Sequence, residues 1–111
     1  MQIRKTYSGV NPELVYDEVR DFILKQSVRI SEQKLETSAL PGDSSSFMSR
    51  GTMTFAAKDG AGVVSIRAHI VGSIKTETKM ILDIDERLFP PDKIASLQQD
   101  IDFIFSSYEV K

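Results

Sequence analysis

Residues 47–71 alternate between apolar and polar positions and predict a β-hairpin, with Asp59 and Gly60 as a two-residue type I′ turn. One face of this hairpin is mostly apolar and has the opposed pairs Phe55 and Val64, Met53 and Ile66, Gly51 and Ala68, and Ser49 and Ile70. The other face has Thr54 with Ser65, Thr52 with Arg67, Arg50 with His69, and Met48 with Val71. Because directly opposed antiparallel residues share a face, this register predicts which side chains are buried.

Three more segments have strand patterns. Residues 2–8 predict a first strand with Ile3 and Tyr7 inward, and Lys5 on the same face is typical of an edge strand. A second strand begins at Val28, but Leu35 is out of phase with its start, so this strand either contains a bulge near 32–33 or switches faces. The last strand spans about 75–85 and has the inward positions Met80, Leu82 and Ile84. The serine-rich residues 37–46 predict the longest loop.

Two helices complete the pattern. Asn11 as N-cap and Pro12 at the first helical position predict a helix that runs to about Gln26. Its apolar stripe has helical spacing and consists of Val15, Val19, Phe22, Ile23 and Gln26. A second helix, from Pro91 to about Tyr108, has a heavier stripe of Ile94, Leu97, Ile101, Ile104, Phe105 and Tyr108.

The order of elements predicts an α+β fold: a single antiparallel sheet of about five strands in the order β-α-β-β-β-β-α, with both helices on one face and a long C-terminal helix. A chain of 111 residues has the usual size of one domain, so residues 1–111 are expected to form a single domain. The net charge of -2 gives no field that would attract nucleic acid or an anionic membrane, and we expect neither as a partner. The absence of cysteine and of any long apolar run favours a cytoplasmic protein.

In this order of elements the whole chain resembles the β-α-β4-α architecture of TATA-box-binding-protein-like domains and of helix-grip domains such as the Bet v 1 and START-like proteins. The resemblance is one of architecture, since no residue motif of either group is matched. The helix-grip resemblance implies an apolar ligand between the terminal helix and the sheet. The resemblance to TATA-box-binding-protein-like domains implies a binding surface on the uncovered face of the sheet, which those domains use for DNA.

Small side chains on three inward-facing strand positions are the first candidate site. Gly51, Ala68 and Thr78 are expected side by side, beneath Phe105 and Tyr108 of the last helix. They indicate either a mostly apolar ligand cavity or a gap that Phe105 or Tyr108 fills.

Arg50, Arg67, His69 and Glu77 are expected together on the outward face of the sheet. They form either a surface that binds an anion or a partner, or a solvated group of compensating charges. A catalytic site would have to be built from these four residues, because the chain has no cysteine, no metal-ligand spacing and no phosphate-binding loop in the right context. We therefore expect a non-enzymatic protein with no catalytic residue, metal or cofactor.

Two weaker features remain. Asp83, Asp85 and Glu86 place carboxylates near one another, but they provide too few converging oxygens for a Mg²⁺ or Ca²⁺ site. Phe103 and Val110 lie opposite the apolar stripe of the last helix, where they are either ordinary exposed residues or a homo-oligomer interface.

The sequence thus leads to two hypotheses of function. The first is a domain that binds a small apolar ligand between the C-terminal helix and the sheet. The alternative is a protein–protein interaction or homo-oligomerisation module that uses the open sheet face or the outer side of the last helix.

Overall fold

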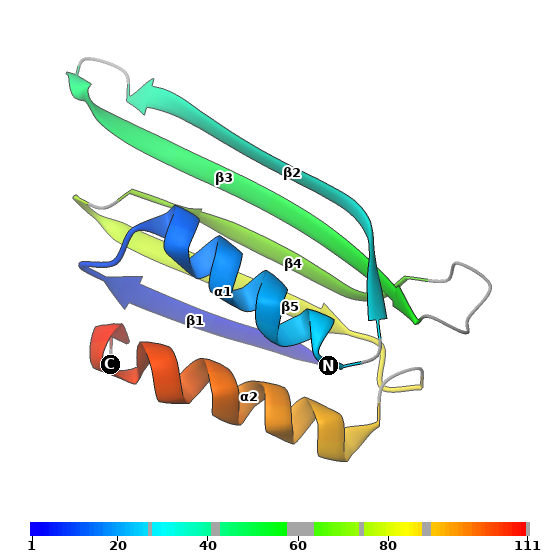
Figure 1. Ribbon diagram of the computed structural model, residues 1–111. Helices are drawn as coiled ribbons and strands as arrows, with labels where there is room; N and C mark the ends of the chain where they lie inside the picture. The colour runs from blue at the N-terminus through cyan, green and yellow to red at the C-terminus, as the bar shows by residue number, and fades with distance from the viewer. Residues whose placement is uncertain (27, 41–42, 58–63, 74, 88–89, 111) are drawn as a thin grey trace.

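The computed structural model describes residues 1–26, 28–40, 43–57, 64–73, 75–87 and 90–110. Its elements are β1 (Gln2–Ser8), α1 (Pro12–Leu24), β2 (Val28–Leu40), β3 (Asp43–Ala57), β4 (Val64–Gly72), β5 (Glu77–Ile84), α2 (Pro91–Phe105) and the 3₁₀ turn η1 (Ser106–Tyr108). The five strands form one antiparallel sheet in the order β1-β5-β4-β3-β2, and both helices lie on the same side of it (Figure 1). The predicted α+β fold and its order of elements are confirmed.

The hydrophobic core lies between the helices and the sheet. Residues of both helices and of the inner faces of the strands form one cluster of buried side chains. The largest of its fully buried members are Tyr7, Phe55, Phe105, Ile23, Met53, Ile66, Ile70, Met80, Leu82, Leu97, Ile101 and Val15. The inward positions predicted for the first and last strands, including Ile3 and Ile84, are buried as expected. No helix in the described part of the chain is long and apolar enough to cross a membrane.

The start of α1 follows from its first two residues. The side chain of Asn11 accepts a hydrogen bond from the backbone N–H of Glu13 at 2.9 Å, and Pro12 occupies the first turn. Val15, Val19, Phe22 and Ile23 of the predicted stripe are buried, whereas Gln26 lies beyond the end of α1 at Leu24 and is half-exposed. The helix also buries Tyr16, which was not predicted to be inward. Tyr16 precedes Val19 by three positions and Ile23 by seven, so it lies beside the stripe on the helix surface.

The α-helical part of α2 is shorter than predicted. It ends at Phe105, and the next three residues form the 3₁₀ turn. Ile94, Leu97, Ile101 and Phe105 are buried as expected. Ile104 and Tyr108 are about 40% exposed, so their predicted burial is wrong. A 3₁₀ turn has three residues per turn instead of 3.6, which moves Tyr108 away from the helical stripe.

The register of β3 against β4 differs from the predicted one by two residues. The two-residue turn predicted at Asp59 and Gly60 lies outside the described part of the chain. Because the difference is an even number, residues 48–55 and 66–71 keep their predicted faces although their predicted partners were wrong. Val64, predicted inward, is half-buried, and Ser65, predicted outward, is buried, because the register shifts between Phe55 and Ala56. The observed partners are Phe55 with Ile66, Met53 with Ala68, Gly51 with Ile70, and Arg50 with Val71.

The segment predicted as the longest loop, residues 37–46, is mostly strand. β2 continues to Leu40 and β3 begins at Asp43, so the two strands form a long hairpin (Figure 1). The two alternatives for β2 are also resolved: the register shifts between Ile30 and Glu32, which brings Leu35 onto the inner face opposite Gly51. Loop composition was misleading here because serine and threonine are also tolerated in strands whose faces are exposed.

The two edges of the sheet differ. β1 is an edge strand, as Lys5 indicated, but the segment after α2 pairs with it: Tyr7 bridges to Glu109, and the N–H of Val110 donates to the carbonyl oxygen of Thr6 at 2.8 Å. Lys5 holds the same segment through an ion pair with Glu109 at 3.0 Å. β2 forms the opposite edge, and no other segment of the described chain pairs with its outer side.

Candidate functional site

The candidate cavity residues are not side by side. Gly51 lies opposite Ile70, whereas Ala68 lies between Met53 and Leu82. Thr78 lies opposite Gly72 and Tyr7 in a third row. The three small residues belong to three different rows of the sheet, so the predicted row of small side chains is wrong. The two-residue error in the register of β3 against β4 separated Gly51 from Ala68, and a four-residue error in the register of β4 against β5 separated Ala68 from Thr78.

The space above Gly51 is filled by α1. A Cβ atom on Gly51 would lie 2.6 Å from Cε2 of Tyr16 and 3.3 Å from Cδ1 of Leu35. A side chain at this position therefore has no room, because the Tyr16 ring already packs directly on the glycine. Of the two interpretations of the small residues, a ligand cavity or a filled gap, the contacts at Gly51 favour the filled gap. The side chain that fills it is Tyr16, and not Phe105 or Tyr108 as expected.

The remaining candidate cavity residues are part of the packed core or lie outside it. Phe105 is fully buried, and its ring is 5.3 Å from that of Tyr7 at an interplanar angle of 43°. The hydroxyl of Thr78 donates to the carbonyl oxygen of Val10 at 3.4 Å. Tyr108 lies in the 3₁₀ turn with 38% of its surface exposed. These contacts favour protein packing over a ligand site at these positions.

A small open hollow of about 220 Å³ lies at the start of α1, against the β2–β3 hairpin. Its polar groups already bond to one another: the hydroxyl of Thr37 donates to Glu13 at 3.2 Å and lies 3.0 Å from the hydroxyl of Ser49. The hollow is lined by Asn11, Pro12, Glu13, Thr37, Phe47 and Ser49. The hydroxyls of Thr37 and Ser49 therefore have hydrogen-bond partners within the protein.

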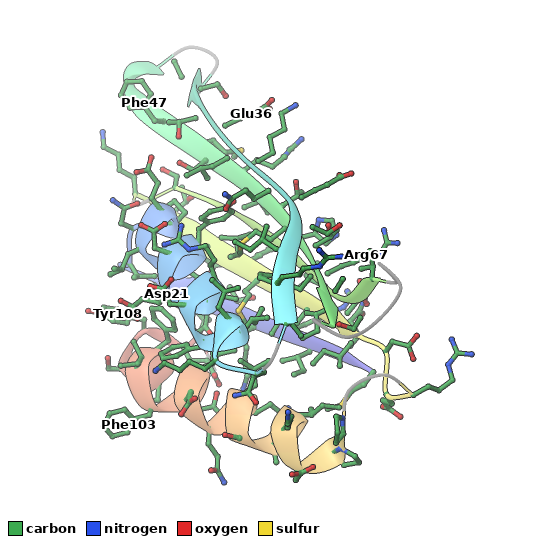
Figure 2. The ribbon with its side chains drawn as sticks, turned by 45° about the vertical axis from the view of Figure 1, so that its right-hand side comes forward. Asp21, Glu36, Phe47, Arg67, Phe103 and Tyr108 are labelled. Atoms are coloured by element: carbon green, nitrogen blue, oxygen red, sulfur yellow. The ribbon has the colours of Figure 1, made fainter. Side chains whose placement is uncertain are left out.

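The opposite face of the sheet is not covered by the helices, and its side chains form regular rows across the strands. The central row is Arg4, Ile81, His69, Thr52 and Lys34, in strand order from β1 to β2. The rows on either side are Thr6, Lys79, Val71, Arg50 and Glu36, and Gln2, Asp83, Arg67, Thr54 and Glu32. Figure 2 shows Arg67 on the side of the sheet away from the two helices.

These rows correct the predicted outward cluster. Arg50 lies opposite Val71 and not opposite His69, which is its diagonal neighbour. Arg67 lies opposite Asp83, and Glu77 pairs with Ser8 at the end of β5. The structure therefore brings Arg50, Arg67 and His69 near one another but leaves Glu77 apart, so Glu77 is not placed to orient His69 in acid–base catalysis.

Two residues of this face were missed as site candidates. Ile81 and Val71 are half-buried apolar side chains that flank His69, Ile81 in the same row and Val71 two residues along β4. The alternation of the last strand placed Ile81 outward, but its neighbours depend on the register, which sequence alone did not give. We call the following group the open-face patch: Ile81, Val71 and His69, surrounded by Arg4, Arg50, Arg67 and Lys79.

The four cations of the open-face patch are exposed. Among the residues that the structure describes, no ion pair within 4.0 Å joins them to a carboxylate. Arg4 instead donates to the side-chain oxygen of Gln2 at 2.6 Å. Four cations without ion-pair partners around two apolar side chains form a surface that suits an anionic partner with apolar groups of its own.

The helix side of the molecule has the opposite charge. The helices carry seven carboxylates: Glu13, Asp17, Glu18, Asp21, Asp92, Asp100 and Asp102. They carry only two cations, Arg20 and Lys93, and Arg20 is paired with Asp17 and Asp21. The small net charge therefore conceals a molecule that is acidic on its helix layer and has the four cations of the open-face patch on the opposite side of the sheet.

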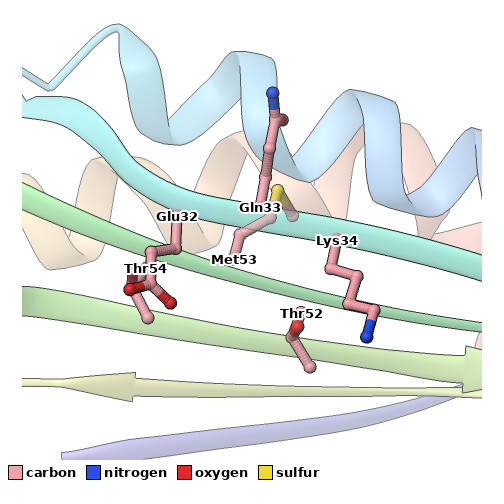
Figure 3. Close-up of a pocket in the computed structure, with 6 residues that line it drawn as sticks. All are labelled: Glu32, Gln33, Lys34, Thr52, Met53 and Thr54. Carbon is pink, nitrogen blue, oxygen red and sulfur yellow. The ribbon is translucent and has the colours of Figure 1, made fainter.

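The edge strand β2 borders the open face with its own ion pair. Lys34 Nζ lies 2.8 Å from Glu36 Oε1, and both side chains are mostly exposed. Their hydrogen bond lowers the pKa of Glu36 and raises the pKa of Lys34. A hollow of about 390 Å³ lies beside this pair, and Figure 3 shows that Gln33 and Met53 in its lining point toward the helices while Lys34 and Thr52 point the other way.

The three carboxylates at the end of β5 have protein partners. Asp83 accepts from the side-chain amide of Gln2 at 2.9 Å, and Glu86 lies 3.6 Å from the amino group of Met1. Asp85 accepts from both the backbone and the guanidinium of Arg87, and these bonds lower its pKa. Within the described residues, no group of three or more potential metal ligands comes together.

Phe103 and Val110 differ in their surroundings. Phe103 projects from α2 away from the sheet, with 85% of its surface exposed (Figure 2). Val110 follows the 3₁₀ turn, and its backbone is tied to β1. They belong to different segments and do not extend one continuous stripe of α2.

Comparison of the chain with protein-family models, with curated proteins and with solved structures gave no match.

Proposed function

We propose that this chain is a non-enzymatic protein-interaction module whose open-face patch binds an acidic segment of a partner protein. The observation that supports the proposal most is the arrangement of Arg4, Arg50, Arg67 and Lys79 around Ile81 and Val71, with no ion pair to any described carboxylate. An apolar centre inside a polar rim is the usual anatomy of a protein-binding surface.

The electrostatics of the whole molecule support the same orientation. An acidic partner is repelled by the helix layer and attracted by the open face, so it approaches the sheet. The resemblance to TATA-box-binding-protein-like domains, which is one of architecture alone, also favours the uncovered sheet face as the binding surface. The helix-grip alternative, an apolar ligand between α2 and the sheet, has less support because Tyr16 of α1 packs on Gly51 and Phe105 of α2 is fully buried in the core.

The proposal is tested with a labelled acidic peptide that contains two leucines, measured by fluorescence anisotropy. The Arg50→Glu and Arg67→Glu variants are expected to weaken binding about tenfold each, because each reversal replaces an attraction by a repulsion at the rim. Lys93→Glu, on α2, is the matched control and is expected to leave binding unchanged. Binding should also weaken with added salt, as it does between exposed charges.

Two results would contradict the proposal. If Lys93→Glu weakens binding as much as Arg50→Glu, the affinity for the peptide depends only on the net charge of the protein and not on the open-face patch. If a single-stranded oligonucleotide binds at the same patch much more tightly than the peptide, the partner is nucleic acid and the proposed partner class is wrong.

A further inference from the structure

The two edges of the sheet differ in whether another segment of the described chain pairs with them. The β2 edge is a surface separate from the open-face patch. The β1 edge is partly closed by the bridge between Tyr7 and Glu109. The β2 edge is long, and its residues 31–39 are all exposed. A free strand edge offers backbone N–H and C=O groups to another strand.

The regular part of this edge is defined by two irregularities. The pairing of β2 with β3 shifts between Ile30 and Glu32, and again between Ala39 and Leu40. The uninterrupted stretch is therefore residues 32–39. In it, Glu32, Lys34 and Glu36 share the open face of the sheet, while Leu35, 40% exposed, lies on the helix face.

We propose that β2 pairs antiparallel with β2 of a second copy of this chain, across a two-fold axis at Leu35, so that two five-stranded sheets join into one. At this register Lys34 of each copy lies opposite Glu36 of the other, and the two Leu35 side chains meet on the helix face. The ion pair within each strand, at 2.8 Å, thereby becomes part of a group of four alternating charges.

The charge pattern selects the register centred on Leu35, because the neighbouring registers of the two β2 strands are less favourable. An axis at Lys34 places the two lysines opposite each other and sets Glu32 against Glu36. An axis at Glu36 sets the two Glu36 carboxylates against each other. An axis at Gln33 pairs Glu32 with Lys34, but it extends into the irregularity next to Ile30. Charged edge strands usually resist pairing, and this one is self-complementary when it is centred on Leu35.

The helices leave room for such a dimer. α1 contacts β2, β3 and β4, so it is centred over β3. Across the joined sheet, the two β3 strands are three strand spacings apart, or roughly 14 Å. Packed helices are separated by about 8–10 Å, so the two α1 helices do not collide and leave space for the Leu35 pair between them.

The first test reverses the charges of the edge. Lys34→Glu and Glu36→Lys should each raise the dimer dissociation constant, measured by analytical ultracentrifugation, at least tenfold. The double variant K34E/E36K should dimerise like the unaltered chain, and a mixture of the two single variants should form a heterodimer. Lys75→Glu, in the exposed turn before β5, is the matched control. Circular dichroism checks that each variant is folded.

The second test reads the register. The chain has no cysteine, so Leu35→Cys introduces a single thiol, and mild oxidation should cross-link it into a disulfide dimer. Gln33→Cys should not cross-link, because its two copies would lie about 13 Å apart, beyond the reach of a disulfide. A chain that is monomeric at high concentration would overturn the proposal. A dimer that is unchanged by Lys34→Glu, or that cross-links equally well through residue 33, would overturn it too.

Discussion

At the scale of single residues, Tyr7 is the buried side chain whose environment is most unusual. Its hydroxyl is buried with no hydrogen-bond partner among the described residues, and its ring packs on Phe105. Burial, with smaller contributions from the carboxylates of Glu109 and Asp102, raises the pKa of Tyr7. Tyr7 therefore contributes its ring to the core, while its hydroxyl costs stability.

Tyr7→Phe should raise the free energy of unfolding at neutral pH by about 1 kcal/mol, because it removes an unsatisfied buried hydroxyl. The unfolded chain has an ordinary tyrosine pKa of about 10, below the raised value in the folded state, so stability should fall as the pH rises above about 10. Tyr7→Phe should lose less stability over that range. Urea unfolding at pH 8 and pH 10.5 measures both effects, and a Tyr7→Phe variant that is less stable at pH 8 would show that the hydroxyl has a partner.

Gly51 tests whether the gap under α1 is filled. Gly51→Ala should lower the free energy of unfolding by about 1–3 kcal/mol, because the new methyl group meets the Tyr16 ring. In a Tyr16→Ala background the same substitution should cost less than half as much, since the ring is gone. Equal costs in the two backgrounds, from a double-mutant cycle in urea, would mean that Tyr16 does not occupy this space.

At the scale of elements, the sequence predicted well which segments are helices or strands and which strand residues face inward. It predicted poorly which residues pair across neighbouring strands. Alternation assigned the inward residues correctly in β5 and in the regular parts of β3 and β4, because a face depends only on whether a position is odd or even along the strand. It failed at the start of β4, where Val64 is half-buried and Ser65 is buried beside the register shift. The partners in the β3–β4 ladder depend on the length of the connecting turn and on the shift at Phe55, which alternation does not report. Both candidate site clusters were assembled from predicted partners in the β3–β4 and β4–β5 ladders, and both changed because the two observed registers differ from the predicted ones.

The β2–β3 hairpin shows a second limit of prediction. Its serine-rich end has the composition of a loop, yet it forms strand, because two antiparallel strands satisfy each other's backbone groups whatever their exposed side chains are. The burial of Tyr16, in contrast, could have been predicted from its spacing to Val19 and Ile23.

The closure of the β1 edge is also testable at this scale. Lys5→Met keeps the apolar stem but removes the ion pairs to Glu109 at 3.0 Å and Asp102 at 3.6 Å. We expect the Val110 amide to exchange with deuterium about tenfold faster, and the free energy of unfolding to fall by no more than about 1 kcal/mol, as for a partly exposed ion pair. Lys93→Met is the control, and an unchanged Val110 exchange rate would mean that Lys5 does not hold this segment.

At the scale of the whole molecule, the sheet separates two surfaces of different character. One side is a packed core covered by acidic helices, and the other carries four exposed cations around Ile81 and Val71. The composition of the chain hides this separation, because its 14 basic and 16 acidic residues nearly balance. A dimer joined at β2 would place two open-face patches on one continuous sheet, which would let a long acidic segment bind both.

The most direct measurement is a titration of the isotope-labelled protein with the acidic, leucine-containing peptide, followed by the backbone amide signals in NMR spectra. The account predicts that the largest shifts occur at Arg50, Arg67, His69, Val71 and Ile81, with little change in α1 and α2. Shifts centred on α2 around Phe103, or on core residues around Tyr16, would contradict it, because binding would then use the helix side and not the open face of the sheet.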